Sequence, residues 1–282
     1  MRFNLSLTRT GTHALLTFNY QYPLSAAIYK IISRADEAYA DFLHNKGYGD
    51  GLKSFKLFTF SDLKAPFKIR NDGLQLLNRQ AELVVSFHLP QAAESFIKGL
   101  FMNQELEIAD RQNRVVFSIT QVTAQPALAG ISQSGNIQEL LLQPLSPVVC
   151  GVKNEQGNYS FLSPEHPDFV RQLLYNWQEK YKALYGIEET ERAFAGVAME
   201  VVFFRQPPRS RLVTIKAETP AETKIRGFTN FRLKVRGSNA ALELLVNAGA
   251  GIYSSLGMGC VQVVPMQEIV VKEKPPAIQT IP

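Results

Sequence analysis

In the first part of the chain, segments in which every second residue is apolar are followed by segments in which apolar residues recur at helical spacing. Apolar residues alternate over residues 2–7 and 14–19, and the turn residues between them predict two short strands. A helix is expected over about residues 23–33. Helical geometry places Tyr29 about 130° from the apolar stripe of that helix, so its ring is predicted to point away from the core.

A second helix is predicted over about residues 36–45, with His44 almost opposite its apolar side. Glycines follow it directly, so the imidazole is expected near an exposed helix end. The next segment, residues 55–61, alternates like a strand that Lys56 opens.

The rest of this half predicts strands near 66–70 and 81–88, a helix near 91–99, and a hairpin of residues 104–109 and 114–122. The resulting order is strand, helix, strand, strand, helix, strand. That order is typical of a ferredoxin-like domain.

The second half repeats the order after a Pro-, Gly- and Ser-containing boundary at residues 125–135. The predicted elements are strands at 137–142, 147–152, 195–205, 210–217, 228–236 and 260–264, and helices at 164–185 and 238–247. We therefore predict an α+β fold of two tandem ferredoxin-like (RRM-like) domains, residues 1–125 and 136–265, followed by a tail over 266–282.

Residues 249–259, the glycine loop, contain two Gly-x-Gly pairs: Gly249 and Gly251, then Gly257 and Gly259. Ser254 stands where a dinucleotide fingerprint needs its third glycine, and Gly257 precedes Met rather than the Lys-Ser/Thr of a P-loop. The loop also follows a helix and precedes a strand. We expect its own amide groups to converge on an anionic group such as phosphate.

Composition allows a core in each domain and a polyanionic partner. The 282 residues are 45% apolar, the net charge is +5 and the pI is about 9.1. Nine basic and two acidic residues lie between Val201 and Arg236. Alternation there places Arg232, Lys234 and Arg236 on one face of a predicted strand.

Two cysteines and four histidines form no metal-ligand spacing, so we expect neither a metal ion nor another cofactor. Cys150 and Cys260 fit a reduced, cytoplasmic setting. The N-terminus lacks the apolar core of a signal peptide, and no apolar run is long enough to cross a membrane.

The glycine loop resembles the signature loop of the RAMP superfamily of CRISPR-associated proteins, although such loops often carry a Lys or Arg between the pairs and residues 252–256 here do not. Within that superfamily, the chain is similar to the endoribonucleases that cut CRISPR repeat transcripts, the Cas six family. The similarity extends over Asn19–Leu24, Ile28–Lys30, Phe42–His44, Lys56–Ser61 and Lys224–Phe228, in that order. Two ferredoxin-like domains are also what this resemblance implies.

The resemblance implies a catalytic Tyr29, His44 and Lys56 and cleavage without a metal. The RNA 2′-hydroxyl would attack the adjacent phosphorus, leaving a 2′,3′-cyclic phosphate and a 5′-hydroxyl. His44 would transfer a proton, because an imidazole has an unperturbed pKa of about 6.5. Lys56 would stabilise the charge of the phosphorane, and Tyr29 would position an oxygen.

The predicted RNA contacts combine basic residues with the glycine loop. They are Lys53, Lys224, Arg226, Arg232, Lys234, Arg236, Gly249, Gly251, Tyr253, Ser254, Ser255, Gly257 and Gly259. The predicted partner is CRISPR repeat RNA, and the resemblance leaves open an effector complex and a second copy of the chain.

Other readings of these residues stay open. A histidine at a helix end often only complements the helix dipole, Tyr29 could cover a loop, and Lys56 could be a solvated strand residue with Lys53 in its place. The main alternative function is a non-cleaving RNA-binding subunit of a CRISPR interference complex. A nucleotide-binding enzyme is a third possibility.

Overall fold

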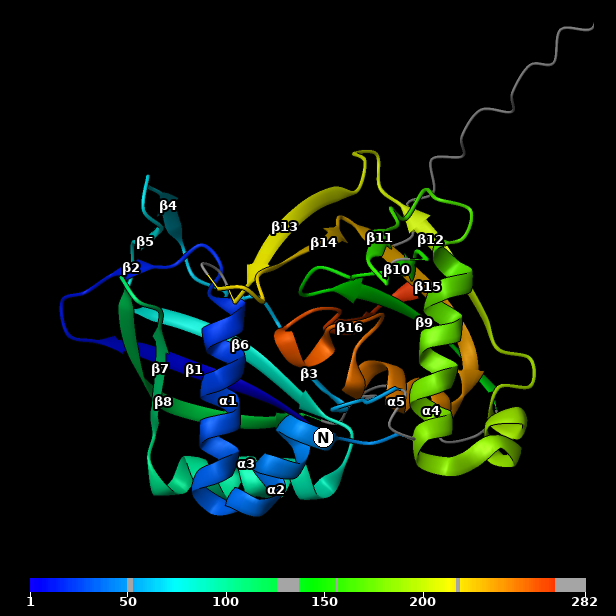
Figure 1. Ribbon diagram of the computed structural model, residues 1–282, viewed down its shortest axis with the longest axis horizontal. Coiled ribbons are helices and arrows are strands. Elements are labelled where there is room, and N and C mark those ends of the chain that lie inside the picture. The colour runs from blue at the N-terminus through cyan, green and yellow to red at the C-terminus, as the bar shows by residue number, and fades with distance from the viewer. Residues whose placement is uncertain (50–52, 126–136, 156, 217–218, 267–282) are drawn as a thin grey trace, which may run out of the picture.

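The computed structural model describes residues 1–49, 53–125, 137–155, 157–216 and 219–266. Two antiparallel sheets lie side by side, each covered by helices, and the glycine loop lies between them (Figure 1). This arrangement confirms the predicted α+β fold of two ferredoxin-like units. The boundary near residues 126–135 and most of the C-terminal tail lie outside the described residues.

The first sheet has the order β3-β6-β1-β8-β7. Its strands are β1 (Arg2–Thr10), β3 (Phe58–Phe60), β6 (Gln80–Phe87), β7 (Glu105–Ala109) and β8 (Arg114–Gln125). Helices α1 (Gln21–Ala35) and α3 (Pro90–Met102) supply the apolar cover of this sheet. The apolar stripe predicted for α1 is buried, because Leu24, Ile28 and Ile32 are all 0% exposed.

Smaller elements complete this half. They are the sheet of β2 (Leu15–Leu16), β4 (Phe67–Ile69) and β5 (Leu74–Leu76), the short helix α2 (Glu37–Asp41), and one turn of π-helix, η1 (Phe42–Lys46). The Asp36 side chain caps α2 by accepting a hydrogen bond from the Tyr39 amide.

The second sheet has the order β12-β15-β9-β16, which matches the order of β3-β6-β1-β8 in the first sheet. Its elements are β9 (Ile137–Pro144), α4 (Phe169–Ala193), β12 (Ala198–Phe203), β15 (Phe231–Ser238), α5 (Asn239–Ala248) and β16 (Val261–Val264). Phe231, Leu233 and Val235 of β15 are fully buried, whereas the basic residues between them point to the other face. This confirms the alternation predicted for that strand.

The second half contains two hairpins whose pairing was not predicted. They are β10 (Gly151–Lys153) with β11 (Tyr159–Phe161), and β13 (Arg209–Ile215) with β14 (Thr223–Thr229). The strand expected over 210–217 is present as β13. Asn230 has a φ of 63° and separates β14 from β15, where the sequence predicted one strand from 228. Helix α4 extends beyond its predicted end, with a break at Gly186.

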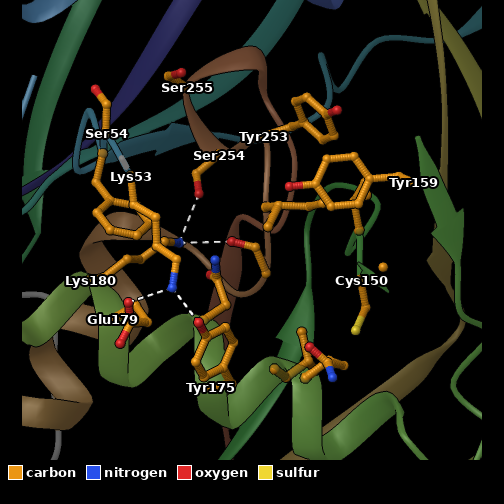
Figure 2. Close-up of a pocket in the computed structure, with 18 of the residues that line it drawn as sticks. Lys53, Ser54, Cys150, Tyr159, Tyr175, Glu179, Lys180, Tyr253, Ser254 and Ser255 are labelled. Carbon is orange, nitrogen blue, oxygen red and sulfur yellow. Dashed lines mark hydrogen bonds and ion pairs between the residues drawn. The ribbon is translucent and has the colours of Figure 1, made fainter. Parts of the chain in front are cut away.

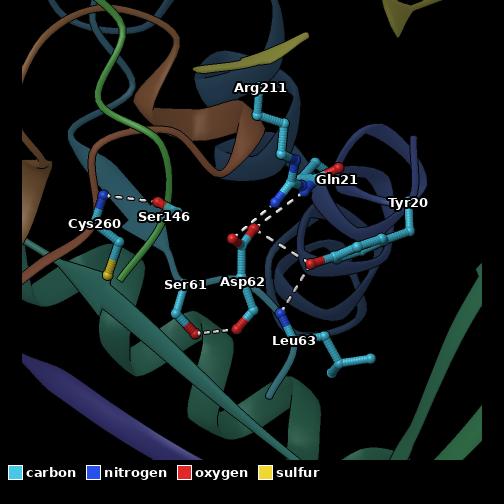
Figure 3. Close-up of polar contacts among 8 residues, drawn as sticks. All are labelled: Tyr20, Gln21, Ser61, Asp62, Leu63, Ser146, Arg211 and Cys260. Atoms are coloured by element: carbon cyan, nitrogen blue, oxygen red, sulfur yellow. Dashed lines mark hydrogen bonds and ion pairs between the residues drawn. The ribbon is translucent and has the colours of Figure 1, made fainter. Parts of the chain in front are cut away.

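The two halves are joined by buried polar contacts. The Arg2 guanidinium of β1 donates to the carbonyl of Val261 in β16 at 2.6 Å. Asp62 accepts hydrogen bonds from Tyr20, Gln21 and Arg211, so its carboxylate connects the first half to hairpin β13–β14 (Figure 3). Burial and the neighbouring Asp62 carboxylate raise the pKa of Tyr20, which keeps its hydroxyl a donor. None of the described helices is sufficiently long and apolar to cross a membrane.

The partly buried imidazole of His88 should make the stability of the fold depend on pH. Its Nε2 lies 3.0 Å from the Tyr185 hydroxyl of α4, and burial, with the Met1 amino group, lowers its pKa to about 4. The unfolded state, with the ordinary pKa of about 6.5, therefore takes up the proton first as the pH falls. Stability should be lost from about pH 6.5 down to pH 4, by about 1–2 kcal/mol after discounting for partial exposure.

Urea unfolding at pH 7.5, 6, 5 and 4 measures this loss. His88→Gln should show a shallower pH dependence over this window, whereas the exposed control His13→Gln should match the wild type. Parallel curves for wild type and His88→Gln would contradict the assignment.

Candidate functional site

The glycine loop packs between the two halves of the molecule. The Thr59 hydroxyl of β3 donates to the carbonyl of Met258 at 3.0 Å, and the Ser25 hydroxyl of α1 donates to that of Ser255 at 2.6 Å. On the other side, Ile225 of β14 and Met258 share a small apolar cluster. The loop is thus held by α1, β3 and hairpin β13–β14.

All four glycines of the loop are buried, and their positions are explained by close packing. A Cβ at Gly251 or Gly259 would lie closer than 3.0 Å to backbone atoms, and one at Gly257 would lie equally close to the Phe60 ring. Amides of the loop donate to protein carbonyls: Ala250 to Gly259, Ile252 to Val149, and Gly259 to Pro147.

These contacts correct the expectation of phosphate binding for five of the loop amides. The amides of Ala250, Ile252, Leu256, Gly257 and Gly259 are already used within the protein, and the glycines allow tight backbone packing instead. Residues 252–256 line the open side of the loop, where Ser254 is buried and the other four are partly exposed. RNA binding by the four glycines and by Tyr253, Ser254 and Ser255 stays a prediction.

Lys180 of α4 binds the buried side of the glycine loop. It was not among the residues predicted from the sequence. Lys180 is 3% exposed. Its ammonium donates to the carbonyls of Ala248, Gly249 and Gly251 and to the Ser254 hydroxyl at 2.7–3.2 Å; Figure 2 shows the bond to Ser254. Burial lowers the pKa of Lys180 to about 7. The sequence contained a signal for it, because Lys180 falls on the apolar stripe of Leu173, Trp177 and Tyr181.

Tyr29 and His44 meet at the tip of the glycine loop. Their ring centroids lie 5.3 Å apart with an edge-on geometry, and Phe58 packs against the other side of Tyr29. Tyr29 lies off the apolar stripe of α1 as predicted, but it is half-buried, with Phe58 against its ring and Ser255 of the loop at its hydroxyl. Burial raises the pKa of Tyr29 to about 12, opposed by a hydrogen bond from Ser255, so the phenol is protonated at neutral pH.

His44 lies in the π-helical turn rather than in a regular helix. The Gly47 amide donates to the carbonyl of Phe42, five residues earlier, and so closes the wide turn. The imidazole is exposed as predicted, and its Nδ1 lies 3.1 Å from Oδ1 of Asn45. Single π-helical turns are often found at functional sites.

Lys56 and Lys53 occupy different positions. The Lys56 side chain packs on Gly47, just after the π-helical turn, and its Nζ lies 3.3 Å from the Ser54 hydroxyl. Burial lowers the pKa of Lys56. Lys53 instead reaches across to α4, where it pairs with Glu179 at 2.6 Å and with the Tyr175 hydroxyl. Lys56 is therefore placed closer to the element that carries His44.

A cavity of about 650 Å³ opens beside this group of residues. Lys56 and Ser255 are part of its wall, and Lys180 lies at its base. The other walls come from hairpin β10–β11 and helix α4 (Figure 2). The described residues include no group of three or more His, Cys, Asp or Glu side chains placed to hold a metal ion.

The predicted basic residues of the second half are not in this cavity. Lys224 and Arg226 are exposed on β14, on the side opposite Ile225, and Lys224 lies 3.9 Å from Glu222. Lys234 is paired with Glu139 and Glu200 of the neighbouring strands. Arg232 and Arg236 share its face of the sheet, with Arg232 mostly buried over the Phe204 ring. None of these side chains lines the cavity that Lys56 borders.

Gly257 offers a test of loop packing with a matched control. Gly257 and Gly157 have φ angles of 79° and 80°, but only a Cβ at Gly257 would meet other atoms, those of the Phe60 ring. Gly157→Ala should cost about 1–2 kcal/mol for the left-handed conformation alone. Gly257→Ala should cost about 2–5 kcal/mol, because the ring must also move. Equal losses in urea unfolding would contradict the packing role.

Lys180 provides a second test. Lys180→Met leaves several buried carbonyls without their donor, so the free energy of unfolding should fall by about 2–4 kcal/mol. Lys182→Met on the same helix removes only a 3.8 Å surface ion pair with Glu179, and should change it by less than about 0.5 kcal/mol. The reverse order of effects, measured by urea unfolding, would refute the anchoring role.

Comparison with known proteins gives consistent matches along the chain. The family model for the N-terminal part of CRISPR-associated protein Cas6 matches residues 15–122, and the model for its C-terminal part matches residues 133–263. A curated CRISPR-associated endoribonuclease Cas6 from Methanocaldococcus jannaschii is 29% identical over 265 residues, covering 93% of this chain and 92% of that protein. The Cas6 endoribonuclease from Pyrococcus furiosus is 26% identical over 248 residues, covering 87% and 83%.

Solved structures agree with these matches. A structure described as CRISPR associated protein Cas6 has a TM-score of 0.66 and 27% identity, covering 94% of this chain and 99% of that one. A RAMP protein described as binding different RNA substrates has a TM-score of 0.72 at 20% identity, covering 94% and 100%, which shows the shared fold. Taken with the paired ferredoxin-like units and the glycine loop between them, these matches establish that the chain belongs to the Cas6 family.

Proposed function

We propose that this protein is an endoribonuclease that cuts CRISPR repeat transcripts without a metal ion, through attack by an RNA 2′-hydroxyl. The observation that carries the proposal is the meeting of Tyr29 and His44 from the first half with Ser255 from the second. A proton-transfer group thus lies beside a loop that other contacts fix in place. The names of the curated relatives, both CRISPR-associated endoribonucleases, support the same conclusion.

His44 transfers a proton in the proposed reaction. Its exposed imidazole can reach a substrate oxygen, and a positioned acid or base contributes about 10²- to 10⁴-fold to rate. The nucleophile and the leaving group both belong to the RNA. The protein therefore has only to transfer protons and to stabilise charge.

Tyr29 acts as a hydrogen-bond donor rather than as a base. Its pKa of about 12 keeps the phenol protonated at neutral pH. With its ring held between Phe58 and His44, the hydroxyl has a defined direction. It is therefore suited to orient the 2′-oxygen or the leaving oxygen.

Lys56 stabilises the negative charge that develops on phosphorus. Its partly buried position strengthens its interaction with a phosphorane, because screening by water is weaker there. Lys53 is less suited to this role because Glu179 already neutralises it.

The exposed basic residues Lys224 and Arg226 hold RNA outside the reaction centre. Hairpin β13–β14 spans the space between the two halves (Figure 1), so cations on its outer side can follow a phosphate backbone. The main alternative is a non-cleaving subunit that binds crRNA with the same fold.

Incubation of the protein with its own repeat RNA in EDTA tests the proposal. We expect a single cut that leaves a 2′,3′-cyclic phosphate and a 5′-hydroxyl, and no cut when the nucleotide before that site is 2′-deoxy. His44→Ala should lower the single-turnover cleavage rate by about 10²- to 10⁴-fold and leave RNA affinity nearly unchanged. The control is His13→Ala, which removes an exposed imidazole from a loop of the first half.

Two outcomes would reject the enzymatic assignment. One is wild-type protein that binds the repeat but never cuts it, which would favour the non-cleaving subunit. The other is cleavage by His44→Ala at the wild-type rate.

A further inference from the structure

The cavity beside the candidate active site extends well past the three proposed catalytic residues. Its volume of about 650 Å³ falls within the range of sites that hold small ligands, about 300–1,000 Å³. Lys56 and Ser255 belong both to its wall and to the surroundings of Tyr29 and His44. Whatever enters the cavity is therefore next to the phosphate that would be cut.

One wall of the cavity is aromatic. The rings of Tyr159 and Tyr253 lie 6.0 Å apart between centroids with an interplanar angle of 69°, and both are half-buried. Tyr253 has a φ of 61°, an uncommon conformation for a bulky side chain. Hydrogen bonds on both sides hold it there, from Ile252 to Val149 and from Leu256 to Tyr253. Fixed rings of this kind offer a face on which a planar group can stack.

The opposite side of the cavity carries side-chain amides from α4. Gln172 and Asn176 both line it. Among the described residues, the Asn176 Oδ1 is buried without a hydrogen-bond partner. Rotation about the last torsion of an asparagine is easy, so the amide can present either an acceptor or a donor to a ligand. Such amides are common partners for the polar edges of nucleobases.

Charge at the cavity favours an anionic ligand. Four lysines line it, at positions 53, 56, 153 and 180. Lys53 pairs with the one carboxylate of the lining, Glu179, and the Lys180 ammonium is bound by the loop carbonyls, so Lys56 and Lys153 supply the positive charge. The Lys153 ammonium lies over the Tyr159 ring, 5.5 Å from its centroid, so the aromatic wall carries a cation of its own. A base could stack on the rings while its phosphate contacts Lys153 or Lys56.

We propose that this cavity is a specificity subsite that holds one unpaired nucleobase of the bound RNA, stacked on the Tyr159 ring with Tyr253 against its edge and read by the amides of Gln172 and Asn176. The base belongs to a nucleotide directly beside the cut phosphate, because Lys56 and Ser255 are shared by both places. The inference rests on the proposed RNA cleavage and adds a reason for cutting at one position in the repeat.

A set of repeat RNAs tests the subsite. Each RNA replaces one of the nucleotides on either side of the cut with an abasic residue, and kcat/KM is measured in EDTA. One abasic position should lower kcat/KM of the wild type by about tenfold or more, since stacking a base on an aromatic ring has an effect of this size. Tyr159→Leu should lower kcat/KM on intact RNA by a similar factor and should no longer distinguish the two RNAs.

Two further variants make the test specific. Tyr159→Phe keeps the ring and should behave like wild type. Asn176→Ala should weaken discrimination among the four bases at the sensitive position, and it serves as the second variant if thermal unfolding shows that Tyr159→Leu is misfolded. Tyr22→Leu replaces an exposed tyrosine outside the cavity and should change nothing.

The results separate the two hypotheses. Wild type that fails to cut intact RNA rejects the proposed function itself. Wild type that cuts intact RNA but is insensitive to every flanking abasic residue rejects the subsite alone. The subsite is also rejected if the abasic residue lowers kcat/KM by the same factor in wild type, in Tyr159→Leu and in Asn176→Ala.

Discussion

The tight packing of the glycine loop is the constraint on which the rest of this structure depends. The loop occupies a space bounded by β3, by hairpin β13–β14 and by the buried ammonium of Lys180. No side chain larger than hydrogen fits at Gly251 or Gly259 without moving backbone atoms. The same packing that fixes the loop also fixes the two halves against each other, since Thr59 and Ser25 come from the first half.

Because the loop is fixed, the residues on its open side have defined positions. Ser255 lies at the hydroxyl of Tyr29, and Tyr253 faces Tyr159. The candidate reaction centre and the adjacent cavity are therefore built on two sides of the same loop segment. Neither half alone contains both, so the site is a property of the assembled molecule.

The sequence predicted the fold well because each strand and helix carries its own hydrophobic period. Ser238 and Gly249 marked the ends of α5 correctly: the serine side chain caps the helix and the glycine has a φ of 80°. The tertiary roles were harder to predict. Period alone indicated that Tyr29 leaves the apolar stripe, but not that a loop more than 200 residues later contacts it.

The glycine loop shows the limit of local reasoning more clearly. Two Gly-x-Gly pairs are compatible with amides that bind phosphate and with backbones in close contact, and only the neighbours decide between them. Those neighbours, Val149 and Phe60, are distant in sequence. Lys180 was missed for a related reason, because a lysine on an apolar stripe can either extend its ammonium to solvent or satisfy buried carbonyls.

The wide turn at Phe42–Lys46 bears on how such a protein can diverge. A π-helical turn contains one residue more than an α-helical turn, and this extra residue sets the direction of the His44 side chain. Of the five residues in the turn, only Leu43 is buried. Loss of a single codon there would restore ordinary helical winding and rotate the following side chains by about 100°. The contacts that hold the glycine loop come from other elements, through Ser25, Thr59 and Lys180, so such a change would redirect the imidazole and leave that packing in place.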